Sequence, residues 1–294
     1  MLGIALMVVA AVCNAAASVL QRRASRTEPA SAEFSLRIIG DLMRRPAWLL
    51  GVGAMVTGFV LHAVSISVSR IALVQPVLIA ELPFTLVLAS WAFRMRVPPR
   101  DWAAILLSSV GLAAFLGCLA PTGGDPGRVA PATWALAGGV TVAAVAVLVA
   151  AGYRGRREHR AVFLSIATGA VFGLNSALIA GVGASVATGT NLFATWQTYA
   201  VAVVGPAGFY LLQNALAAGN LVASQPGFTL TNPLVSVVWG LAVFGEQARG
   251  GPWPAGTVIG GLLIATGTII LARSDLLNPD TAAGQRTDAP PRRA

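Results

Sequence analysis

The sequence is poor in charged residues, and this deficit excludes a water-soluble globular protein. Only 11% of the 294 residues are charged, and none of them is a lysine. Soluble domains carry about 25% charged residues, whereas 56% of this chain is hydrophobic and its mean hydropathy is +0.74. We therefore expect an all-α membrane protein whose main solvent is the lipid bilayer.

Cysteine and histidine are equally scarce, with two of each. Cys13 and Cys118 fall at different depths of the predicted membrane spans, so we do not expect them to form a disulfide. The spans hold one histidine and neither a GxSxG nor an HExxH motif, which argues against an intramembrane enzyme. No glycine-rich nucleotide-binding loop is present, and the net charge of +9 lies in short arginine-rich loops. We therefore expect no cofactor, no catalytic residue and no nucleic-acid partner.

Nine apolar stretches are long enough to cross a bilayer, which takes about 20 residues. They cover about two thirds of the chain and leave no room for a soluble second domain. The predicted spans are residues 2–20, 47–66, 71–92, 102–120, 132–151, 161–184, 192–213, 221–244 and 255–272.

The arginines predict how these spans are oriented. With nine spans, 17 arginines fall on one side of the membrane and three on the other. Because positive charge accumulates on the cytoplasmic side, we expect a multi-pass protein of the plasma membrane with its N-terminus outside and its C-terminus in the cytoplasm. Tryptophans near span ends are typical of an interfacial belt, and they are Trp48, Trp91, Trp102, Trp134 and Trp253.

An internal repeat is visible at an offset of 150 residues. It relates span 71–92 to span 221–244, and the matched pairs include Gln75 with Gln225, Pro76 with Pro226, Pro83 with Pro233, and Gly111 with Gly261. The odd connecting span turns the second set upside down, which gives two inverted four-helix repeats, an architecture of many secondary transporters. We assign residues 1–120 and 161–274 to the two repeats, 121–160 to the connector helix and its loops, and 275–294 to a disordered cytoplasmic tail.

The matched prolines predict helix kinks near the centre of the membrane. Proline removes a backbone hydrogen bond and clashes with the carbonyl four residues earlier. Interrupted helices in corresponding positions of two repeats are the best sequence indication of a transport site. The alternative is that neighbouring helices repair these kinks and that they serve packing alone. The predicted kinks lie at Pro76, Pro83, Pro226 and Pro233.

Glu81 is the main candidate for binding or coupling an ion. It lies about ten residues into span 71–92, where a charge costs roughly 2.5–3.5 kcal/mol, and such residues commonly mark ion or proton pathways. No arginine lies within a predicted span to balance it. The alternative is a carboxyl group that hydrogen-bonds a neighbouring helix for packing. His62 lies near the outer end of its span, either as an interfacial residue or as part of the outer end of a binding site.

Several amides and a hydroxyl complete the predicted site. Gln75 and Gln225 each precede the first proline of a repeat, and Thr231 and Asn232 occupy the region of the second repeat that matches Glu81. These side chains are either contacts for a substrate or ion, or buried groups that satisfy carbonyls freed by the prolines. Asn14 and Asn175 are weaker candidates of the same kind. The sequence does not identify a metal site.

These motifs together resemble a known transporter family. The Gln-Pro helix, the glycine-containing span after it and the Gly245-Glu246 pair resemble the drug/metabolite transporter superfamily of the EamA type. The nine-span layout, with Gln75-Pro76 and the Gln21-Arg22-Arg23 segment after span one, is more similar to its NIPA-type, magnesium-transporter-like branch. The resemblance implies a helical carrier that binds its substrate between the two repeats.

We therefore predict a secondary transporter of a small solute that works by alternating access, with protons as one candidate for the coupling ion. The alternatives are a divalent cation transporter of the magnesium type and a membrane scaffold that transports nothing. The partners expected are a small-molecule or ionic substrate and the lipid bilayer. Two GxxxG pairs permit close helix packing, within the bundle or between two copies in a homodimer, and they are Gly169/Gly173 and Gly256/Gly260.

Overall fold

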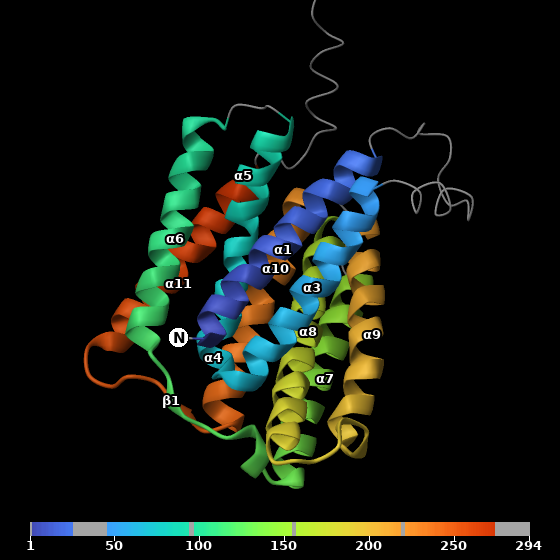
Figure 1. Ribbon diagram of the computed structural model, residues 1–294, viewed down its shortest axis with the longest axis vertical. Helices are drawn as coiled ribbons and strands as arrows, with labels where there is room; N and C mark the ends of the chain where they lie inside the picture. The colour runs from blue at the N-terminus through green and yellow to red at the C-terminus, as the bar shows by residue number, and fades with distance from the viewer. Residues whose placement is uncertain (1, 26–45, 94–96, 155–156, 219–220, 274–294) are drawn as a thin grey trace, which may run out of the picture.

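The computed structural model describes residues 2–25, 46–93, 97–154, 157–218 and 221–273, and these residues form a bundle of long helices (Figure 1). The predicted tail 275–294 lies outside the described residues. The all-α prediction needs one small addition, because two strands of two residues each, β1 (Thr122–Gly123) and β2 (Glu246–Gln247), form an antiparallel pair.

The first half of the chain contains four helical segments, one of which is interrupted. The continuous helices are α1 (Leu2–Ser25), α3 (Pro46–Val68) and α6 (Pro99–Leu119). Between α3 and α6 the chain forms α4 (Ile71–Val74), the 3-10 segment η2 (Gln75–Ala80) and α5 (Glu81–Phe93). After β1, a short 3-10 turn η3 (Pro126–Arg128) leads into the next helix.

The described residues of the second half form five further helices. Helix α7 (Pro131–Arg154) is followed by α8 (Arg157–Ala187), the turn η4 (Leu192–Ala194) and α9 (Trp196–Ala218). Helix α10 (Leu221–Val238) continues into a π-helical turn, η5 (Trp239–Val243). After β2, α11 (Trp253–Ala272) ends the described chain.

Seven helices within the described residues are long and apolar enough to cross a membrane, which supports a membrane-embedded protein. The other two predicted spans coincide with α9 and α10, and α10 contributes a shorter apolar stretch, Gly227–Val243. A count of nine spans therefore stays a prediction. The seven are Leu2–Leu20, Pro46–Val68, Ile71–Ala92, Pro99–Leu119, Pro131–Arg154, Arg160–Ala187 and Trp253–Leu271.

The helices pack in pairs. Helix α1 lies against α3, α8 lies against α9 and α10, and α6 crosses α11 (Figure 1). The interrupted helix lies between α1 and α10. In the most apolar 18-residue stretch of its span Ile71–Ala92, 56% of the residues are buried. For α7, which packs mainly on α8, the buried share is 6%. The interrupted helix is therefore central, and the connector helix is peripheral.

Glycines allow the closest of these contacts. A Cβ atom on Gly111 of α6 would lie 2.8 Å from the backbone nitrogen of Ile264 in α11, and one on Gly260 would lie 2.6 Å from the backbone nitrogen of Phe115. A Cβ atom on Gly169 of α8 would lie 2.9 Å from the carbonyl oxygen of Phe228 in α10. Within the described residues, glycines of both GxxxG pairs thus face neighbouring helices of the same chain.

Aromatic side chains close one end of the bundle. Trp134 packs against Trp239 with ring centroids 5.3 Å apart, and against Phe244 at 5.5 Å. Trp196 meets Trp134 edge-on at 5.5 Å. Trp134 is only 5% exposed. The prediction that this side chain belongs to an interfacial belt is therefore wrong. It lies inside the bundle because the turn η5 presents an apolar surface to the start of α7.

Candidate functional site

Glu81 is the first residue of α5 and forms a hydrogen bond with the opposite helix α1. The side-chain amide of Asn14 donates to Oε2 of Glu81 at 3.3 Å. One turn further along α5, the hydroxyl of Thr85 donates to the backbone carbonyl of Glu81 at 2.8 Å. Both side chains of the Asn14–Glu81 pair are half-buried. An amide donor beside a carboxyl group can stabilise its ionised form in an apolar region.

The local backbone explains how Glu81 reaches this position. Pro76 has no N–H to donate, and the chain between Gln75 and Ala80 forms a 3-10 segment instead of an α-helix. The 3-10 segment is tighter than an α-helix, so it rotates the following residues about the helix axis. Glu81 then begins a new α-helical segment that includes Pro83 in its first turn.

A second polar pair lies at the other end of the same break, where the 3-10 segment begins. Nε2 of Gln75 and Nε2 of His62 are 3.0 Å apart. Because an amide nitrogen can only donate, the imidazole Nε2 of His62 accepts in this arrangement, which corresponds to a neutral ring. Gln75 is fully buried, and its carbonyl oxygen has no hydrogen-bond partner. The structure thus joins two predicted site residues that are 13 positions apart.

The second half of the chain contributes polar atoms that have no such partners. The buried carbonyl oxygens Oδ1 of Asn175 in α8 and of Asn232 in α10 have no hydrogen-bond partner. Thr231 packs against Gly169 of α8. Gln225 lies in α10, but its side chain falls outside the described residues. Helix α10 contacts η2, so the two halves of the chain meet at the interrupted helix.

The irregular turn that follows helix α10 does not lie at the prolines of that helix. Helix α10 is α-helical from Leu221 to Val238, a range that includes Pro226 and Pro233. The departure from α-helical geometry comes later, in the π-helical turn Trp239–Val243. In the span Ile71–Ala92, by contrast, the departure begins at Gln75, next to Pro76.

Glu246 is a buried carboxylate that the sequence analysis did not place in the site. Its side chain is 5% exposed and accepts hydrogen bonds from the backbone N–H groups of Ile71, at 2.9 Å, and Ala72, at 3.1 Å. Burial raises the pKa of Glu246, against the opposing effects of these two hydrogen bonds and of the nearby Arg70 charge. A carboxylate at a helix N-terminus also benefits from the helix dipole. Glu246 thus fixes the start of α4.

The surroundings of Glu246 form a connected network at this end of the bundle. Glu246 pairs with Gly123 in the two-stranded sheet, and the guanidinium of Arg70 donates to the carbonyl of Gly123 at 2.9 Å. The backbone N–H of Asp125 donates to the carbonyl of Phe244 at 3.0 Å. Segments from both halves of the chain are therefore tied together here.

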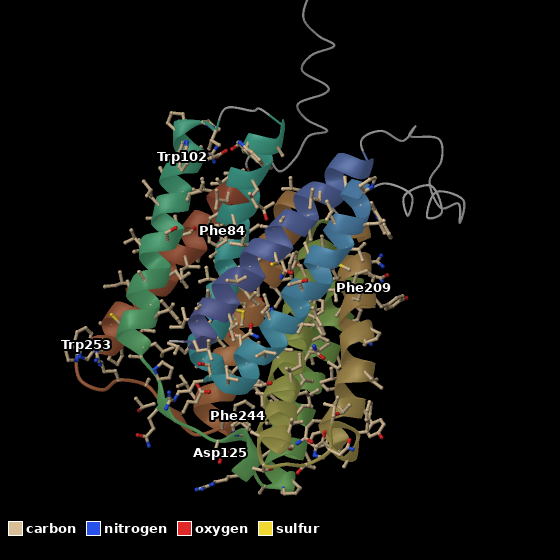
Figure 2. All side chains as sticks on the ribbon, viewed as in Figure 1. Phe84, Trp102, Asp125, Phe209, Phe244 and Trp253 are labelled. Atoms are coloured by element: carbon tan, nitrogen blue, oxygen red, sulfur yellow. The ribbon has the colours of Figure 1, made fainter. Side chains whose placement is uncertain are left out.

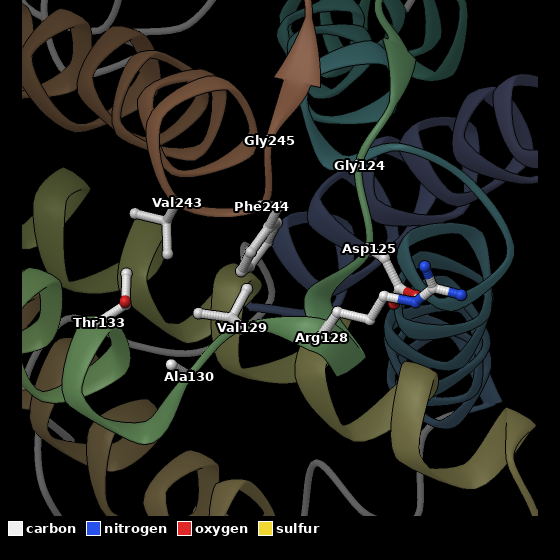
Figure 3. A pocket seen from close by; sticks show the side chains of 9 residues that line it. All are labelled: Gly124, Asp125, Arg128, Val129, Ala130, Thr133, Val243, Phe244 and Gly245. Atoms are coloured by element: carbon white, nitrogen blue, oxygen red, sulfur yellow. The ribbon is translucent and has the colours of Figure 1, made fainter.

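A cavity of about 550 Å³ opens beside this network (Figure 3). Phe244 and Val129 lie next to each other in its lining, and Thr133 lies to one side of them. The only charged side chains in its lining, Asp125 and Arg128, form an ion pair of 3.2 Å and are well exposed. Figure 2 shows Asp125 and Phe244 at the same end of the molecule, opposite Trp102.

The predicted span 102–120 begins just after Asp101, which leaves Glu81 as the carboxylate within the predicted spans. The structure corrects this point. Helix α6 begins at Pro99, so Asp101 lies in its first turn and is 2% exposed. Its carboxylate lies close to the helix N-terminus, where negative charge is favourable. Asp101 therefore lies at the end of the helix, whereas Glu81 lies in the middle of its span.

No cluster of three or more His, Cys, Asp or Glu side chains suited to a metal ion occurs within the described residues. Both cysteines, Cys13 and Cys118, are free thiols, as predicted.

Comparison with known proteins gives one similar protein of bacterial origin. An uncharacterized protein of Corynebacterium glutamicum is 29% identical over 269 residues, which cover 88% of this chain and 90% of that protein. No protein-family model and no solved structure matches the chain. The resemblance to the drug/metabolite transporter superfamily therefore stays a prediction.

Proposed function

We propose that the protein is a secondary transporter that moves a small solute across the membrane by alternating access, with Glu81 as the residue that couples transport to a proton. The observation that carries this proposal is the carboxyl group itself. It lies in the middle of the span Ile71–Ala92, at the point where a 3-10 segment gives way to an α-helix. Ionisable residues at this depth are costly and commonly serve ion or proton movement.

The interruption of the helix supports the same proposal. Irregular backbone at membrane depth is tolerated where it is covered by protein or lines a water-filled cavity. Transporters commonly bind substrate at such interrupted helices near the bilayer midplane. Here the interruption Gln75–Ala80 carries the buried pair of Gln75 and His62 at one end and Glu81 at the other.

Paired helix contacts support the proposed inverted repeat. Helix α1 packs on α3 in the first half as α8 packs on α9 in the second. The helices α6 and α11 occupy corresponding places and cross each other near Gly111 and Gly260. We propose residues 1–120 and 161–274 as the two halves that move against each other, with α7 as the connector.

We place the protein in the plasma membrane with its N-terminus outside and its C-terminus in the cytoplasm, on the strength of the arginine distribution. In this orientation the network around Glu246 faces the outside. We also propose membership of the drug/metabolite transporter superfamily, near its magnesium-transporter-like branch, because of the motifs around Gln75 and Gln225.

A divalent cation is the second candidate substrate, and the unpaired carbonyl oxygens favour it. Oxygen atoms of amides and carboxylates are the ligands of Mg²⁺, which keeps several waters and needs few carboxylates. Gln75, Asn175 and Asn232 each hold a buried carbonyl oxygen without a hydrogen-bond partner. Glu81 would supply the carboxylate of such a site, and α10, which carries Asn232, contacts the interrupted helix that carries Gln75.

A reconstituted flux assay tests these proposals. Proteoliposomes loaded with a pH-sensitive dye would be exposed to a panel of small solutes, and vesicles loaded with a magnesium-sensitive dye to Mg²⁺. We expect one solute to move protons with it, and we expect Glu81→Gln to abolish that movement while Asp125→Asn, at an exposed ion pair, retains it. The absence of any dye response to the solutes or to Mg²⁺ would favour a scaffold, and Mg²⁺ entry alone would favour the cation transporter.

A further inference from the structure

Three helices meet at the side chain of Asn14. It belongs to α1, its amide nitrogen donates to Oε2 of Glu81 on α5, and its carbonyl oxygen faces Gly58 on α3. Within the described residues, no hydrogen bond engages the other carboxyl oxygen of Glu81. Asn14 therefore holds one oxygen of the carboxyl group and leaves the second available.

Gly58 provides the space that Asn14 occupies. A Cβ atom at Gly58 would clash with Oδ1 of Asn14 and would lie 3.2 Å from the backbone carbonyl oxygen of Ala10. If Gly58 became alanine, the contact of its Cβ atom with the Ala10 carbonyl oxygen would need only a small adjustment of the backbone. The side-chain amide of Asn14, by contrast, would have to move to another position. The absence of a side chain at Gly58 thus determines where the amide points.

The other half of the chain has a related arrangement that lacks the carboxyl group. Asn175 of α8 faces α9, where a Cβ atom on Gly205 would lie 3.7 Å from its carbonyl oxygen. That oxygen is buried and has no hydrogen-bond partner. The residue that matches Glu81 at the offset of 150 is Thr231. Both Asn14 and Asn175 thus face a glycine of a neighbouring helix. Within the described residues, Asn14 also has a carboxyl partner, whereas the residue that matches Glu81 in the second half is Thr231.

We propose that Asn14, held in place by Gly58, is the positioning residue for Glu81. It orients the carboxyl group so that one oxygen is held by α1 and the other receives the coupling ion. The role of this ion rests on the proposed transport function, whereas the positioning itself does not. Movement of α3 relative to α1 would release the amide, which gives the bundle a way to change the environment of Glu81.

The chain offers a matched control on the same helix. Gly53 of α3 has no atom within 4 Å of a Cβ position, so Gly53→Ala adds the same methyl group without touching Asn14. Asn14→Leu removes the amide and keeps a side chain of similar size. In the double variant Gly58→Ala/Asn14→Ala, the added methyl group has room because the side chain that it would strike is gone.

The rate of chemical modification at Glu81 tests whether Asn14 positions this carboxyl group, and the measurement requires no known substrate. A hydrophobic carbodiimide reacts with protonated carboxyl groups in apolar surroundings, and peptide mass spectrometry measures its rate at Glu81 in purified full-length protein. Loss of a hydrogen bond of this kind changes such an equilibrium by about three- to tenfold. We expect Gly58→Ala and Asn14→Leu to speed modification by that factor, Gly53→Ala to leave it unchanged, and the double variant to match Asn14→Ala.

The outcomes separate positioning from transport. An unchanged rate in Gly58→Ala and Asn14→Leu variants that elute as folded protein overturns the proposal. A change in Gly58→Ala alone also overturns it, because the effect would then bypass Asn14. Faster modification in both variants, combined with normal proton-coupled flux in Glu81→Gln, retains the positioning role and rejects the transport role of Glu81.

Discussion

The carboxylate of Glu246 accepts a hydrogen bond from the backbone N–H of Ile71 at 2.9 Å, although 175 residues separate them. The bond joins the segment after α10 to the start of the interrupted helix in the first half of the chain. Ala72 donates to the second oxygen at 3.1 Å, and there is little free space, since a Cβ atom on Gly240 would lie 2.7 Å from Oε2 of Glu246. In the proposed orientation this contact closes the outer end between the halves.

Removal of the Glu246 side chain should destabilise the protein. Glu246→Ala leaves the buried N–H groups of Ile71 and Ala72 without their acceptor, and an unpaired buried donor costs about 1–3 kcal/mol. The thermal midpoint of the detergent-solubilised protein measures this loss. Asp125→Ala is the control, because its ion pair with Arg128 is exposed and contributes about 0–1 kcal/mol. Equal midpoints for the two variants would contradict a structural role for Glu246.

The raised pKa of Glu246 predicts the sign of a pH effect on stability. Burial raises this pKa in the folded state, so the folded protein binds more protons than the unfolded chain just above the usual Glu value of about 4.3. Stability from this group is therefore greatest at low pH and falls as pH rises through the folded-state pKa. We therefore compare the melting temperatures of the wild type and of Glu246→Gln at several pH values. As the pH is lowered from 7 to 4.5, we expect the melting temperature of the wild type to increase relative to that of the variant. A difference that stays constant over this range would refute the prediction.

The crossing of α6 and α11 should be sensitive to a single methyl group. Gly111→Ala places a Cβ atom 2.8 Å from the backbone nitrogen of Ile264 and 2.9 Å from the carbonyl oxygen of Gly260. Since backbone atoms cannot move aside easily, we expect a loss of about 1–3 kcal/mol, measured by thermal unfolding. Gly117→Ala on the same helix meets nothing within 4 Å and should be tolerated.

The orientation in the membrane can be tested by cysteine labelling. In a variant without Cys13 and Cys118, new cysteines at the exposed positions Thr190 and Arg154 lie at opposite ends of the bundle. We expect a membrane-impermeant thiol reagent added to intact cells to label the cysteine at Thr190 and to reach that at Arg154 only after lysis. Labelling of both in intact cells would contradict the nine-span topology.

Some residues of the candidate site could be identified from the sequence, and others could not. The position of Glu81 within its span and the proline beside the break are local features, and each could be identified from a few neighbouring residues. Asn14 was only a weak candidate, because its hydrogen bond to Glu81 crosses 67 residues. Glu246 carried no local signal of its role, since a helix N-terminus 175 residues away receives it.

The sequence by itself determined that the chain is helical and suited to a membrane, because hydropathy over about 20 residues decides whether a segment can leave water. It also indicated the break next to Pro76, where proline removes a backbone donor, but the tertiary structure decided which proline breaks its helix, since Pro226 and Pro233 lie within the α-helix Leu221–Val238. The tertiary structure alone decided that Trp134 is buried against Trp239, that Gly58 makes room for Asn14, and that the helices α6 and α11 cross at Gly111. These contacts join distant segments, and they depend on how whole helices pack, which no local pattern specifies.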